Sequence, residues 1–187
     1  MSPVIRPPFN ARFLRFASLR RFARDEQGAT AIELAILAIP FFALIGAIIE
    51  TALMFLAAQV LDAAVQDASR LVRTGQAQAQ SYDITAFRTA VCNELFGLFS
   101  CANLQIKVNT VTNFASATTP ASPLNPTDPT QWTLTPGFDP GVGNSVVMVQ
   151  VYYKWPVTLR LGGLNLATSS DGTRLMSSVR VFANEPF

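Results

Sequence analysis

Gly28 and Glu33 are the residues whose types and spacing point most directly to chemistry in this chain. They stand at the head of a long apolar run, because Leu34 to Ile49 carries no charge. A carboxylate just inside a membrane-length apolar helix has a large desolvation cost, so it usually pairs with a cation or serves a function. Glu33 is therefore a candidate for ion pairing. Gly28 directly precedes this run and follows a basic segment.

The apolar run has the length of a membrane span. Half of the 187 residues are hydrophobic and only 14% are charged, whereas about a quarter are charged in a typical soluble domain. This excess sits mainly between Ala29 and Val65, which favours a membrane segment over a large core. From Ala29 to Glu50 is about 31 Å at 1.5 Å per residue, close to the thickness of the hydrocarbon layer. Glu50 then reaches the far boundary, as a carboxylate at headgroup level or one paired within an assembly.

The charge distribution predicts a cytoplasmic N-terminus. The net charge is +2, but six arginines precede the apolar run: Arg6, Arg12, Arg15, Arg20, Arg21 and Arg24. Arginines that flank an apolar helix stay in the cytoplasm. We therefore interpret residues 1–28 as a basic cytoplasmic leader. The rest of the chain has no basic block, so we expect no nucleic-acid partner.

One helix is expected from Ala29 to about Thr74. Residues 29–60 form the predicted transmembrane and assembly helix, with a kink at Pro40, which frees the carbonyl of Ile36. Beyond the membrane, apolar residues recur at intervals of three and four, which is typical of an amphipathic helix: Leu53, Ala57, Val60, Ala64, Ala68 and Leu71. The remainder, residues 61–187, is the predicted periplasmic domain.

The C-terminal part predicts a small α+β domain. Gly75 to Ser81 reads as a linker, and Asp83 as the cap of a second helix. Strands are expected over 104–111, 145–155 and 173–183, from their alternation and their β-branched and aromatic residues. Residues 112–144 hold six prolines and predict a long exposed loop, either a contact surface or a mobile segment. The fold class is thus α+β: a long membrane helix that continues into a domain with a short antiparallel sheet.

Cys92 and Cys101 are the only cysteines, and the chain has no histidine. In an oxidising compartment this pair predicts a disulfide, whereas two thiolates without histidine leave a zinc site short of ligands. Two free buried thiols are the alternative. A Ser-His-Asp triad is impossible without histidine, and no Gly-rich phosphate loop precedes a helix. We therefore expect no enzyme, no catalytic residues, no metal and no cofactor.

The whole chain resembles the TadE-like proteins of tight-adherence (Flp) pilus systems. The resemblance rests on the segment from Asp25 to Leu34, on Pro40 in the helix, and on further matches at Ile48-Ile49-Glu50, Cys92, Cys101 and Asn184 to Phe187. It implies a pilin-like fold and the role of a minor pilin or pseudopilin in the inner membrane, with a periplasmic C-terminal domain.

The resemblance also implies processing and partners. A prepilin peptidase would cut after Gly28, which makes Ala29 the first residue of the mature chain and Glu33 the fifth. Glu33 would then pair with the amine of Ala29 or of a neighbouring subunit. The implied partners are that peptidase, other pilins or pseudopilins, the inner-membrane assembly platform of the pilus, and membrane lipid.

A second hypothesis is an uncleaved single-pass anchor that displays a periplasmic binding or sensing domain. It predicts that the leader stays on the protein and that Glu33 can be replaced without consequence.

Overall fold

The computed structural model of the chain describes residues 28–117, 122–161 and 164–187. The predicted basic leader, apart from Gly28, lies outside the described residues. The chain divides into two compact units, Met1–Ile45 and Gly46–Phe187, and the boundary between them falls within the long helix α2, Ala29–Arg73.

The first part of α2 is apolar and exposed. Alanine, leucine and isoleucine dominate it, and the large hydrophobic side chains from Ile32 to Ile49 that the structure describes are exposed. The helix is long and apolar enough to cross a membrane. It continues through Pro40 and ends one residue before the predicted Thr74, so the predicted long helix is confirmed.

The second part of α2 is amphipathic and carries the domain. Its buried face repeats every three or four residues and includes Met54, Ala57, Leu61, Val65, Ala68 and Val72. Gly75 follows the end of the helix in the left-handed region, at φ 76°, and a Cβ at that position would lie 2.6 Å from the Phe187 ring. The predicted linker 75–81 is wrong in one respect, since it contains a one-turn helix, α3 (Gln76–Ala79). Glutamine and alanine are both good helix formers.

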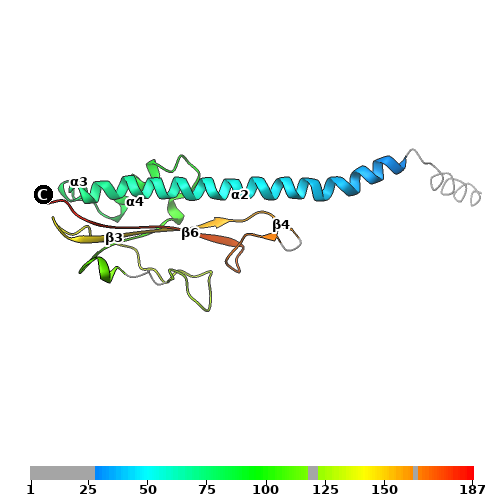
Figure 1. Cartoon of the computed structure of the whole chain (residues 1–187). Helices are drawn as coiled ribbons and strands as arrows, with labels where there is room; N and C mark the ends of the chain where they lie inside the picture. Colours follow the sequence, from blue (N-terminus) through cyan, green and yellow to red (C-terminus); the bar gives the residue numbers. More distant parts are fainter. Residues whose placement is uncertain (1–27, 118–121, 162–163) are drawn as a thin grey trace, which may run out of the picture. The chain divides into compact units, whose positions relative to one another are not determined.

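The domain contains a four-stranded mixed sheet in the order β2-β1-β3-β6 (Figure 1). Its strands are β1 (Gln105–Val111), β2 (Gly137–Phe138), β3 (Val146–Pro156) and β6 (Thr173–Ala183). The three long strands match those predicted and are antiparallel. The short β2 is parallel to β1 and makes the sheet mixed, because two residues of the Pro-rich segment pair with Lys107 and Val108. A separate hairpin joins β4 (Arg160–Leu161) to β5 (Leu164–Asn165).

The core lies between the sheet, the amphipathic part of α2 and α4 (Ile84–Asn93). The Asp83 carboxylate caps α4 as predicted, accepting a hydrogen bond from the Ala86 N–H at 2.7 Å. Alternate residues of β3 and β1 are fully buried against Phe87 and Val91 of α4 and the apolar face of α2: Ile106, Val108, Val147, Val149 and Val151. Figure 1 shows this part of α2 running along β6 and β3.

Polar contacts also join α2 to the strand that packs on it. The Asp62 carboxylate accepts a hydrogen bond from the Ser178 hydroxyl at 2.8 Å and pairs with the Arg180 guanidinium. At the end of the chain, the Glu185 N–H donates to the Arg73 carbonyl at 2.8 Å, and Asn184 is buried. The last residues therefore fasten the C-terminus to the end of α2.

Most of the described residues in the Pro-rich segment are exposed or partly exposed, as predicted, but part of the segment is anchored to the domain. Pro123 and Leu124 are buried, and the segment lies on the face of the sheet away from α2 (Figure 1). Lys154 of β3 holds it in place, because its ammonium group donates to the carbonyls of Pro129 at 2.8 Å and Thr130 at 2.7 Å. The same ammonium pairs with Asp171, whose pKa is lowered by the Thr173 hydroxyl and by Lys154.

Candidate functional site

Gly28 lies directly before α2 and has no structural role within the described part of the chain. It is exposed, its φ is not in the left-handed region, and no described atom outside the local backbone and the two neighbouring residues lies within 4 Å of the place a Cβ would take. Neither packing nor backbone conformation among the described residues therefore explains a glycine here.

Glu33 stands about one helical turn after Ala29, the first residue of α2. Its side chain is exposed, and none of the described residues forms a hydrogen bond or an ion pair with it. Its neighbours in the sequence are apolar and equally exposed. Among the described residues, the carboxylate therefore has no cationic partner.

Glu50, the second acidic residue of the apolar run, differs from Glu33 because it is buried and hydrogen-bonded within the domain. Its side chain is buried, with 7% of the residue exposed. One carboxylate oxygen, Oε1, accepts hydrogen bonds from the Thr158 N–H at 2.6 Å and the Thr158 hydroxyl at 2.8 Å. The Leu159 N–H donates to Oε2 at 3.0 Å. Glu50 thus holds the chain segment after β3 against the helix.

Gly46, one turn before Glu50, belongs to the same contact. A Cβ at Gly46 would lie 3.0 Å from a methyl carbon of Leu159, so the missing side chain lets Leu159 lie close to the helix. No local sequence pattern marks this partner, since Thr158 is 108 residues from Glu50. A lone carboxylate in an apolar run shows that some partner is needed but does not say which.

Cys92 and Cys101 form the predicted disulfide, which links the end of α4 to the turn before β1. The bond fixes the connection that brings Leu95 and Phe99 into the core, where Phe99 packs edge-on against Tyr153. The two cysteines therefore have a structural role.

Replacing both cysteines with serine should lower the free energy of unfolding by about 2.5–3 kcal/mol, because a ten-residue closed loop constrains the unfolded chain by that amount in the chain-entropy model. The check is guanidinium unfolding of the full chain in detergent, followed by the fluorescence of Trp132 and Trp155. A double Cys92→Ser/Cys101→Ser variant as stable as the oxidised protein would contradict a structural role for this bond.

The fold and these sites define an α+β protein with one N-terminal helix that can span a membrane and a mixed-sheet domain on the second part of that helix. Residues 28–70 match the family of TadE-like proteins. The match begins at Gly28 and includes Glu33, Pro40 and Glu50, so the predicted resemblance is confirmed over this segment. It supports a protein associated with the Tad pilus. Comparisons with curated proteins and with solved structures gave no match.

Proposed function

We propose that the protein is a minor pilin or pseudopilin that is cut after Gly28 by a prepilin peptidase and acts in assembly of a tight-adherence (Flp, type IVb) pilus. The observation that carries the proposal is the family match that begins at Gly28. Support also comes from two structural facts: Gly28 has no packing role among the described residues, and Glu33 is exposed and unpaired among them.

Cleavage would create the partner that Glu33 lacks. The new α-amine of Ala29 is a cation about one turn away on the same helix, and the amine of an adjacent subunit carries the same charge. In a membrane each of these charges alone has a high desolvation cost, and pairing offsets part of it. The processed chain would then associate with other pilins or pseudopilins and with the assembly platform through this end of α2.

The proposed placement is a single pass through the inner membrane, with the N-terminus in the cytoplasm and the domain in the periplasm. The arginines before Gly28 support this orientation. The disulfide supports an oxidising compartment for the domain. The role we propose is structural and not enzymatic.

The mass of the mature N-terminus tests the proposal. Protein from membranes of cells with an active prepilin peptidase should begin at Ala29, and protein from peptidase-free cells should begin at Met1 or Ser2. An intact leader in both kinds of cell would overturn the proposal and leave the anchored-domain alternative.

A further inference from the structure

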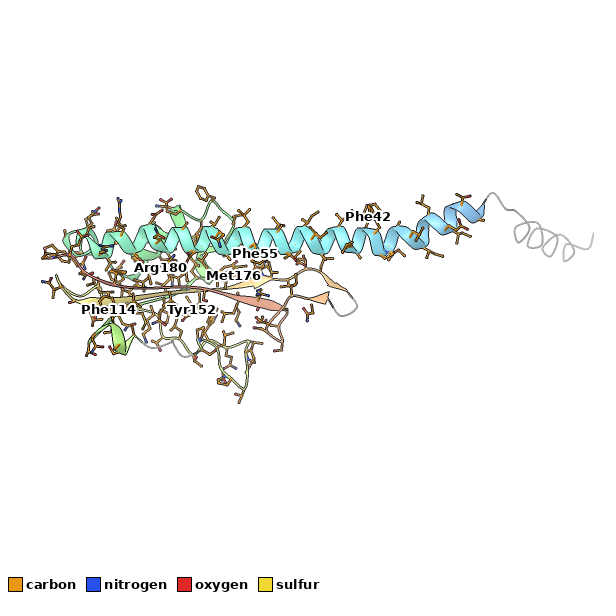
Figure 2. All side chains as sticks on the ribbon, viewed as in Figure 1. Phe42, Phe55, Phe114, Tyr152, Met176 and Arg180 are labelled. Atoms are coloured by element: carbon orange, nitrogen blue, oxygen red, sulfur yellow. A yellow bond between two sulfur atoms is a disulfide. The ribbon has the colours of Figure 1, made fainter. Side chains whose placement is uncertain are left out.

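An apolar groove opens where the sheet domain meets α2, just beyond Glu50. It has a volume of about 430 Å³, within the range of small-molecule sites. Its apolar walls come from Met54, Phe55 and Ala58 of α2 and from Leu166, Leu175 and Met176 near and along β6. Figure 2 shows Phe55 on α2 and Met176 on the adjoining strand.

The groove lies at the level where α2 would leave a membrane. Leu53, Phe55 and Leu56 are about half exposed or more, so the exposed apolar surface of the helix continues past Glu50. From Ile32 to Leu56 is 25 residues, whereas about 20 cross the hydrocarbon layer. The last exposed apolar residues, and the groove beside them, therefore fall at the boundary between acyl chains and headgroups.

Glu50 does not oppose contact with lipid at this level. Its carboxylate is enclosed and accepts hydrogen bonds from Thr158 and Leu159, so it faces the domain and not the bilayer. Leu159, held against Gly46, adds an apolar side chain one turn further into the apolar run. The domain thus presents an apolar side chain, that of Leu159, on the membrane side of the groove.

Arg174 adds a cation to the lining of the same groove. Its side chain is exposed, and within the described residues its one hydrogen bond is from Nη1 to the Leu166 carbonyl at 3.3 Å. A guanidinium has five N–H donors in a planar fork that fits a phosphate. None of the described residues that line the groove is acidic. An apolar groove with a cation among its lining residues matches one ligand abundant at this level, a phospholipid.

We propose that this groove binds a phospholipid of the leaflet from which α2 emerges, with an acyl chain between Phe55 and Leu175 and the phosphate on Arg174. The site would give the protein a second contact with the membrane, in addition to the membrane-spanning part of α2. It rests on the membrane placement proposed for α2, but not on cleavage or on pilus assembly. The other possible occupant, a helix from a second copy, is distinguished by the test.

The test uses the full chain in vesicles of phosphatidylethanolamine and phosphatidylglycerol, with a trace of phosphatidylglycerol that carries a photoreactive acyl chain. After irradiation, we expect label on peptides covering residues 51–58 and 164–177, as well as on residues 29–49. Arg174→Gln should reduce the label on 164–177 about fivefold, the worth of one basic side chain at an anionic surface. Ala58→Trp should fill the groove and abolish that label.

Matched controls separate the groove from general effects. Ala63→Trp adds the same ring to an exposed position on another face of α2, and Arg70→Gln removes an exposed arginine outside the groove. Neither should change the label. If Ala58→Trp does not fold, Arg174→Gln alone tests the proposal, because the Arg174 side chain is exposed and its replacement should not disturb folding.

Three outcomes would overturn the proposal. Label confined to 29–49 would show insertion without a groove lipid. Label on 164–177 that is unchanged by both Arg174→Gln and Ala58→Trp would show that lipid contacts this segment without binding in the groove. Crosslinks between two copies from a photoreactive residue at position 55 would show a protein helix in the groove. If residues 29–49 also lack label, the membrane placement itself fails, which separates that failure from the first.

Discussion

Changing Gly28 to leucine should leave the leader on every molecule in cells with an active prepilin peptidase, so that no protein begins at Ala29. The physical reason is steric, because a branched side chain beside the scissile bond would keep the bond from the active site of the peptidase. The structure separates this effect from misfolding, since no described atom outside the local backbone and the two neighbouring residues lies within 4 Å of the added Cβ. The measurements are the mass of the N-terminus and the unfolding midpoint, which should not change.

Two further variants test whether the effect is specific to position 28 and whether Glu33 acts in assembly and not in cleavage. Ala31→Leu adds the same side chain at another exposed position of the same helix, and we expect the peptidase to cut it after Gly28. Glu33→Ala should also be cut but should give no pili, because the amine of Ala29 would lack its carboxylate. A Gly28→Leu protein that still begins at Ala29 would contradict the processing site. Pili built normally from Glu33→Ala would contradict the role of the pairing.

The sequence was sufficient for the parts of the molecule that local patterns determine. The periodicity of apolar residues gave α2 to within one residue of its end, and β-branched residues gave β1, β3 and β6. Asp83 was recognised as a cap from its residue type and place. The signal that singles out Gly28 and Glu33 is also local, a small residue and a carboxylate at the head of an apolar run, and their roles stay predictions.

What the sequence did not predict depends on contacts between distant segments. The two residues of β2 have no periodicity of their own, and they form a strand only because Lys107 and Val108 offer a free edge. Lys154 holds the Pro-rich segment through backbone carbonyls, which every residue type supplies. The donors to Glu50 are likewise two backbone N–H groups and one hydroxyl, so no residue pattern near position 158 marks them.

This contact leads to the second large effect. Replacing Glu50 with alanine should lower the free energy of unfolding of the domain by about 2–4 kcal/mol, because the N–H groups of Thr158 and Leu159 lose their acceptor and each unmet buried donor costs about 1–3 kcal/mol. The expected loss is smaller than the full cost of two unmet buried donors, because Thr158 is exposed and its hydroxyl can hydrogen-bond to water. Guanidinium unfolding in detergent, followed by tryptophan fluorescence, measures the change.

A graded series identifies the cause of that loss. Glu50→Gln keeps one acceptor oxygen and should cost about half as much, and Thr158→Val removes only the hydroxyl and should cost about 1 kcal/mol. Glu33→Gln, which changes the exposed carboxylate, should leave stability unchanged.

Hydrogen exchange at the Thr158 and Leu159 amides should accelerate in Glu50→Ala ahead of exchange in β3. An unchanged exchange rate at these amides would show that Glu50 does not hold the segment. Gly46 and Leu159 belong to the same contact as Glu50. Loss of this contact in Glu50→Ala should therefore also lower lipid labelling at 164–177, while the label on 29–49 should not change.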